Sequence, residues 1–301
     1  MTKKSIFSLS VLVLLMVGCT EPITVETNDP VESGKMPISV AMEFATRVTD
    51  EGYEFGDKVG LYVVNEGYSL SDSGNHVDNM GFTYDDYSTW TPDEPIYWAN
   101  QYTPATFYCY YPYIEGTPSI YNVYHYTQAD QSSLDGYKAS EFLWGKAESI
   151  SPTSEAVSIT TNHMMANMVI NLKPGKGFTE ESLASADKEV RILNMLNGMC
   201  IDLSSGTGNA FNERPEIAPY KVEGNNTYRA LVVPQTIEAS TDLVTIKIAD
   251  VTYTFTTDRY ISLQSNKRAK FAITIDKINN GVNIGIGEWE EDGVDYGGIA
   301  D

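Results

Sequence analysis

The sequence predicts an all-β protein of two tandem β-sandwich domains behind a lipoprotein signal peptide. Short runs of alternating or continuously apolar residues recur along the chain, and helical periodicity is scarce. About 280 residues remain after the signal peptide, which suggests two domains rather than one. Many short strands separated by turn residues favour sandwiches over alternating α/β units.

Residues 1–18 form the predicted signal peptide. Two lysines precede an apolar stretch, and a small Gly18 stands directly before Cys19. The apolar stretch falls short of the roughly 20 residues that a membrane-spanning helix needs. Residues 15–19 (LMVGC) resemble the bacterial lipobox, in which a peptidase cuts before a cysteine that carries a diacylglyceryl group. Cys19 is therefore the predicted lipidation site, and its lipid is the expected contact with the outer membrane.

The segment 19–36 is polar and acidic, and we expect it to be a flexible tether. The first strand follows it, from Pro37 to Thr46. Alternate residues of this strand are apolar and predict one buried face, which consists of Ile38, Val40, Met42 and Phe44.

Further strands are expected in order along both domains, which we predict to span residues 37–152 and 153–301. The boundary is placed at the polar sequence SPTS, before the long apolar run 157–172. One short helix is expected within 179–187, after the turn-like PGKG. The other strand-like runs are 59–64, 105–111, 119–126, 157–172, 190–196, 228–234, 242–257, 268–278 and 281–289.

The charge of the chain excludes one class of partner. There are 41 acidic and 20 basic residues, a formal net charge of -21. Nucleic acid is therefore not an expected partner, because phosphate binding needs clustered Lys and Arg. With 42% hydrophobic and 11% aromatic residues, the chain has enough apolar side chains to form folded cores.

No motif in the sequence indicates catalysis, so we predict that the protein is not an enzyme and needs no cofactor or metal. Phosphate-binding loops and nucleophile elbows are missing from the sequence, and the three histidines lack metal-ligand spacing. Cys109 lies in an apolar run and is expected to be a small buried side chain. A disulfide between Cys109 and Cys200 stays an open alternative.

Two groups of aromatic residues allow two interpretations. They could stack on sugars, or they could be ordinary residues of buried strands, and the second interpretation is favoured. One group comprises Tyr84, Tyr87, Trp90, Tyr97 and Trp98, and the other comprises Tyr121, Tyr124 and Tyr126.

An ordered set of sequence blocks resembles the fimbrillin (Mfa-like) family of pilin lipoproteins from the Bacteroidales. Residues 44–64 are similar to the family's arginine, short loop and Gly-Leu-Tyr strand. Residues 96–113 resemble its Tyr-Trp turn followed by an aromatic strand. Further blocks that carry the resemblance are EFLWGKA, NHMMANMVINLKPGKGFT, LVVPQTI and AITIDKINNGVNIGIGEW.

The resemblance implies a fold, an activity and site residues. It implies two transthyretin-like β-sandwich domains and a shaft, anchor or tip subunit of a pilus. In shaft subunits a protease removes the tether and the first strand, which would place the cut at Thr46-Arg47 here. The displaced strand would carry Ile38, Val40, Met42 and Phe44, and the strand of a neighbouring subunit would take its place.

The donor strand implied by the resemblance lies in the tail, from about Gly281 to Asp301. Alternation is regular at first and then fades into an acidic sequence. Because of this fading, an uncut anchor or a tip subunit that donates no strand stays open. The candidate donor residues are Val282, Ile284, Ile286, Val294 and Tyr296.

We therefore expect a fimbrial subunit that reaches the cell surface as a lipoprotein, polymerises by protease-triggered strand exchange and supports adhesion. Its expected partners are other pilin subunits, in a homopolymer or heteropolymer, the outer membrane through the lipid on Cys19, and a host protein or glycan. The alternative hypothesis is a surface lipoprotein that binds glycan or host protein without polymerising.

Overall fold

A computed structural model describes residues 34–44, 52–85, 89–224 and 226–277. These residues form nineteen strands in five sheets and two short helices, so the predicted all-β class is confirmed. The described residues from Lys35 onwards form one compact unit. No helix in the described part of the chain is long and apolar enough to cross a membrane.

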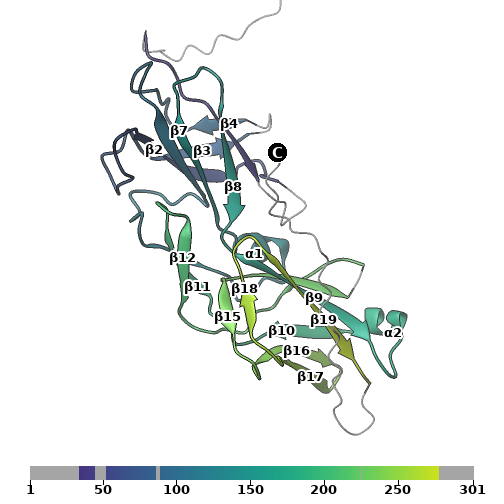
Figure 1. Ribbon diagram of the computed structural model, residues 1–301. Coiled ribbons are helices and arrows are strands. Elements are labelled where there is room, and N and C mark those ends of the chain that lie inside the picture. The colour runs from purple at the N-terminus through teal and green to yellow at the C-terminus, as the bar shows by residue number, and fades with distance from the viewer. Residues whose placement is uncertain (1–33, 45–51, 86–88, 225, 278–301) are drawn as a thin grey trace, which may run out of the picture. The chain divides into compact units, whose positions relative to one another are not determined.

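A seven-stranded sheet contains most of the strands before residue 164 (Figure 1). All of its pairs are antiparallel except the pair of β1 and β8, which is parallel and places β1 at one edge. Its strand order is β1 (Val40–Phe44), β8 (Val157–His163), β7 (Leu143–Ile150), β5 (Ala105–Tyr111), β2 (Lys58–Asn65), β3 (Val77–Tyr84) and β4 (Trp90–Pro92).

Two cores lie on opposite faces of this sheet, which explains why the β2 sequence is apolar without a break. Alternate β2 side chains point to opposite sides, with Leu61 in one core and Tyr62 in the other. The first core contains Ile38, Val40, Met42, Val59, Leu61, Val63, Phe82, Trp90, Trp98, Phe107, Cys109 and Ile159. The second core contains Tyr62, Val64, Tyr110, Val123, Phe142, Met164, Met165, Met199, Ile201, Leu231 and Val233.

A small sheet covers the second core with one of its faces. Its order is β12 (Thr207–Phe211), β11 (Gly198–Asp202) and β6 (Val123–Tyr126), all antiparallel. Helix α1 (Leu134–Lys138) follows β6 and adds Tyr137 to the same core. Ser133 begins this helix, because its hydroxyl accepts a hydrogen bond from the Gly136 amide.

The third core lies in the remaining part of the chain, where the sheets pack in the manner of a sandwich. Helix α2 (Glu180–Ser185) falls within the predicted range 179–187, and Thr179 caps it. The sheets are β13 (Tyr220–Lys221), β14 (Thr227–Val232), β9 (Ala166–Pro174) and β19 (Arg268–Ile275); β10 (Lys188–Ile192), β16 (Asp242–Ile248) and β17 (Val251–Thr256); and the pair β15 (Gln235–Ile237) and β18 (Ile261–Leu263).

The long apolar run 157–172 is divided between two sheets. β8 belongs to the seven-stranded sheet and β9 to the four-stranded one, with Met164 and Met165 buried between them. The predicted boundary at 152/153 therefore falls between β7 and β8, which are hydrogen-bonded neighbours, and the first sheet extends to His163. The division into two domains stays a prediction.

The burial of an aromatic side chain predicts how much it contributes to the stability of the fold. Phe107 is fully buried in the first core, so Phe107→Ala should lower the free energy of unfolding by about 3–5 kcal/mol. Tyr102 is 85% exposed, and Tyr102→Ala should change that free energy by less than about 0.5 kcal/mol. Urea unfolding followed by tryptophan fluorescence measures both. Equal effects of the two substitutions would contradict this assignment of the core.

Candidate functional site at the first strand

The first strand closes the first core from the edge of the sheet. β1 lies beside β8, where Figure 1 shows it in purple. Ile38, Val40 and Met42 are 5%, 6% and 7% exposed, whereas Ser39 and Glu43 face solvent and Ala41 is half-buried. The alternation predicted from the sequence is therefore present, and one face of the strand is part of the core.

Hydrogen bonds to its main-chain carbonyls hold the first strand at both of its ends. The Val157 amide donates to the Ser39 carbonyl (2.8 Å), and the Thr161 hydroxyl donates to the Glu43 carbonyl (3.1 Å). Before β1, the Ile38 amide donates to the Ile96 carbonyl (2.9 Å). The strand is thus bound by backbone pairing as well as by its side chains.

Met42 covers a buried thiol. The Cys109 Sγ lies 3.4 Å from the Met42 Sδ, and Cys109 is fully buried in β5. Burial raises the pKa of the Cys109 thiol, because a thiolate would lose its hydration there. Cys109 is therefore inert in the folded protein, as its apolar sequence context predicted, and both Cys109 and Cys200 are free cysteines.

Tyr53 fixes the chain where the described residues resume after β1. Its ring makes an edge contact with Trp90 (centroids 4.7 Å apart), and its hydroxyl lies 3.1 Å from the Thr161 hydroxyl. Burial raises the pKa of Tyr53, with a further contribution from Cys109. The residues that follow Gly52 are thus anchored in the first core through contacts of their own.

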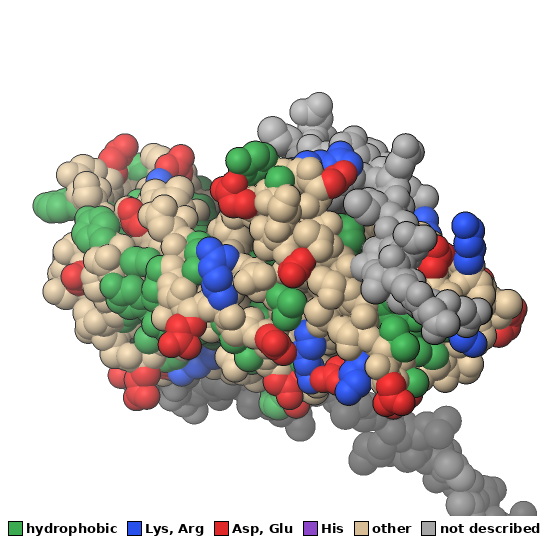
Figure 2. Space-filling view, turned by 90° about the horizontal axis from the view of Figure 1, so that it is seen from below, with side chains coloured by type: hydrophobic (Ala, Val, Ile, Leu, Met, Phe, Trp, Pro, Cys, Tyr) green, Lys and Arg blue, Asp and Glu red, His purple; other side chains and the backbone are tan. Residues whose placement is uncertain are grey.

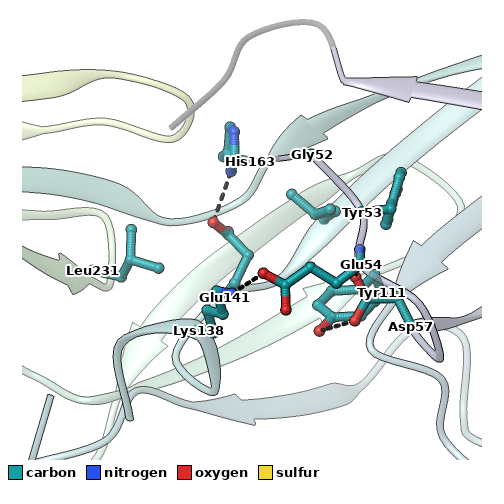
Figure 3. Close-up of a pocket in the computed structure, with 10 residues that line it drawn as sticks. Gly52, Tyr53, Glu54, Asp57, Tyr111, Lys138, Glu141, His163 and Leu231 are labelled. Carbon is teal, nitrogen blue, oxygen red and sulfur yellow. Dashed lines mark hydrogen bonds and ion pairs between the residues drawn. The ribbon is translucent and has the colours of Figure 1, made fainter. Parts of the chain in front are cut away.

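A small pocket lies next to Tyr53, where α1, β5 and β8 meet (Figure 3). The buried His163 Nδ1 lies 2.8 Å from the Glu141 Oε2. Close to this pair, Lys138 forms an ion pair with Glu54. The Tyr111 hydroxyl donates to the Asp57 carboxylate (3.2 Å) on the other side of the pocket.

The pocket is a structural junction rather than a site for a small molecule. Its volume is about 50 Å³, against roughly 300–1,000 Å³ for typical ligand pockets. Each of its three carboxylates already accepts a hydrogen bond or an ion pair from a neighbouring group. These contacts hold α1, β8 and the segment after Gly52 together.

Several residues of the predicted site lie outside the described residues. Val40 and Met42 of β1 and Ile38 just before it are buried together in the first core, and Phe44 is the last residue of the strand. The predicted lipidation site Cys19, the predicted cut at Thr46-Arg47, and the predicted donor residues Val282, Ile284, Ile286, Val294 and Tyr296 are not described.

Within the described ranges, the histidines lie in separate places and no group of three or more His, Cys, Asp and Glu residues could hold a metal ion. His76 donates to the Tyr97 carbonyl (2.7 Å) and His125 to the Ser140 carbonyl (3.1 Å). Acidic side chains are spread over the face seen in Figure 2, and lysine and arginine side chains lie among them without forming one basic patch.

The two aromatic groups have different environments. Trp90 and Trp98 are buried in the first core, as the favoured interpretation expected. Tyr121, Tyr124 and Tyr126 are 53%, 58% and 44% exposed, so core packing does not account for them. Sequence reasoning missed this difference because alternation within β6 shows which side chains share a face but not which face is covered.

The profile of the family described as fimbrillin-like matches residues 46–289. A curated protein from Bacteroides uniformis, named as a candidate fimbrium subunit (Fim1C), is 25% identical over 219 residues, which cover 69% of this chain and 70% of that protein.

Two crystal structures of candidate cell adhesion proteins share the fold. The first, from Bacteroides ovatus, superposes with a TM-score of 0.66 at 15% identity and covers 85% of this chain and 96% of its own. The second, from Bacteroides uniformis, has a TM-score of 0.64 at 17% identity, and the match covers 87% of this chain and all of that one.

The junction gives a prediction about stability. His163→Ala removes the partner of a buried carboxylate and should lower the free energy of unfolding by about 3 kcal/mol. Lys138→Ala breaks the more exposed pair with Glu54 and should cost less than about 1 kcal/mol. Denaturant unfolding of both variants tests this difference. A larger loss in Lys138→Ala than in His163→Ala would contradict it.

Proposed function

The chain belongs to the fimbrillin-like family, and from this membership we propose that it is a fimbrial subunit of the cell surface that assembles by exchanging its first strand. The observation that carries the proposal is the position of β1: an edge strand whose apolar face completes the first core. A strand at an edge can leave without breaking pairs between other strands.

The energy of the buried face indicates what its removal would cost. Each of the side chains Ile38, Val40 and Met42 contributes roughly 1.5–3 kcal/mol when fully buried. Together they amount to a large part of the roughly 5–15 kcal/mol that stabilises a typical folded domain. A subunit without β1 would therefore gain much free energy by accepting a strand from a neighbour.

The anchoring of Tyr53 supports a cut between β1 and Gly52. A protease that cleaves after Arg47 would separate β1 from the segment held by Tyr53, Trp90 and Thr161. β1 could then dissociate while the rest of the first core keeps its attachment to the following chain. The same cut would release the lipid on Cys19, so in this proposal the lipid delivers the subunit to the outer membrane and is lost on assembly.

The incoming strand would come from the tail of another subunit. Val282, Ile284 and Ile286 have the alternation needed to replace Ile38, Val40 and Met42 in the first core, and Val294 and Tyr296 offer further apolar side chains. Backbone pairing with β8 would supply affinity, and the side-chain pockets left by β1 would set the register.

Cleavage and polymerisation should depend on the same residue. We expect limited trypsin to convert the chain from residue 20 onwards into fragments and then into a ladder of polymers on native gels. Arg47→Ala should abolish both steps, because the fragment holding β1 stays attached. Arg259→Ala, at an exposed arginine elsewhere, is the matched control and should leave both unchanged.

Two outcomes would count against this trigger. Polymers formed by uncut protein would show that strand release is not required. Cleavage at Arg47 without polymers, even at high concentration, would instead favour a tip subunit that donates no strand.

Cys109 reports whether β1 has left. In a Cys200→Ala background, a maleimide should label Cys109 slowly in intact protein, because Met42 and the first core cover the thiol. Cleavage after Arg47 should raise the labelling rate by at least tenfold, and polymerisation should lower it again. Mass spectrometry of the labelled peptide provides the measurement. An unchanged labelling rate after cleavage would mean that β1 stays in place.

A further inference from the structure

The small sheet β12–β11–β6 has an uncovered aromatic face. On its inner side, Val123, Met199 and Ile201 belong to the second core. Burial on this inner side also lowers the pKa of His125, which packs against Phe142. On the outer side, Tyr124 and Tyr126 of β6 are 58% and 44% exposed.

Phe211 lies flat on this outer face. A Cβ atom added to Gly198 would meet three atoms at the tip of the Phe211 ring at 2.8, 3.0 and 3.1 Å. These similar distances place the face of the ring, not its edge, over Gly198. The absence of a side chain at Gly198 therefore lets the ring reach from β12 across β11 toward Tyr126.

The two tyrosine rings stand upright beside Phe211. The Tyr124 ring is inclined at 81° to the Phe211 ring and the Tyr126 ring at 75°, with centroids 5.5 and 5.6 Å away. The three rings thus form an open corner with a flat floor and an aromatic wall. We name this set of Tyr124, Tyr126 and Phe211 the aromatic corner.

The three strands that carry the aromatic corner are almost uncharged, although exposed Glu213 and Arg214 follow β12. One fifth of the chain is charged, yet the three strands contain Asp202 as their one Asp, Glu, Lys or Arg residue. Its carboxylate accepts hydrogen bonds from the Ser204 amide (2.8 Å) and hydroxyl (2.6 Å). Exposed amide groups surround the corner, at Asn122, Asn209 and Asn212.

The area of this face is small for a protein interface. Five-residue strands are about 16 Å long, and three neighbouring strands are about 14 Å wide, which gives roughly 220 Å². A stable protein contact buries about 800 Å² on each partner. The face is therefore about a quarter of that size, which suits a few sugar rings better than a folded partner.

We propose that the aromatic corner binds a neutral polysaccharide. The C–H face of a pyranose ring stacks on Phe211 and against the tyrosine rings, and the asparagine amides hydrogen-bond sugar hydroxyls. A neutral ligand fits because the strands supply no cation for an acidic glycan and no acidic cluster for a basic one. This binding would act beside strand exchange and does not depend on it, since β1 and the aromatic corner belong to different sheets.

Native affinity electrophoresis tests the proposal with the chain from residue 20 onwards. The neutral probes are xyloglucan, galactomannan, laminarin, yeast mannan and amylopectin, and the anionic probes are polygalacturonate and heparin. At least one neutral probe should retard the protein, and the anionic probes should not. Titration calorimetry with the retarding polysaccharide then gives the affinity.

The decisive variant is Tyr124→Ala/Tyr126→Ala, which should weaken binding by about tenfold or more, since two stacked rings are lost. Its matched control is Tyr68→Ala/Tyr102→Ala, at tyrosines that are 81% and 85% exposed, and it should bind within twofold of the parent protein. All four substitutions are at exposed positions, and circular dichroism checks that the fold is kept.

Three results would overturn the proposal. The first is a lack of retardation by all five neutral polysaccharides. The second is an equal loss of binding in the control variant, or stronger binding to the anionic probes. The third is self-association in sedimentation velocity that Tyr124→Ala/Tyr126→Ala abolishes, without any polysaccharide binding, which would assign the aromatic corner to a protein contact.

Discussion

The parallel pairing of β1 with β8 is the interaction on which the first core depends. β1 is short and lies at an edge, but its buried side chains share the first core with Phe107 and Ile159, and Met42 lies against Cys109. A core that is closed by an edge strand is complete only while that strand is present. The stability of the subunit therefore depends on having a strand beside β8, either its own β1 or one from another subunit.

The rest of the fold does not depend on β1, so a change of strand at this edge need not disturb the second and third cores. The second core lies on the opposite face of the same sheet and draws on β2, β5, β6 and β11. The junction of His163 and Glu141 ties the end of β8 to the segment before β7. The third core lies among other sheets altogether. Loss of β1 would therefore open one core while two others remain closed.

Local sequence pattern predicted the fold class and the face of β1, because a half-buried strand shows its burial as alternation. It could not divide the run 157–172, because the crossing at Met164 and Met165 is buried and continues without a polar break into the largely buried β9. The junction pairs residues 22 positions apart, which no periodicity reveals. Helix α1 was missed because its five residues are too few to show a helical period, although Ser133 is a recognisable cap.

Hydrogen exchange at the β8 backbone tests the exchange of β1 most directly, beginning with the Val157 amide, which donates to the Ser39 carbonyl. Exchange should be slow in the intact chain, fast in the cleaved monomer after the fragment with β1 is removed, and slow again in the polymer. Protection that persists in the cleaved monomer, or is not regained in the polymer, would contradict the exchange of one strand for another at this edge.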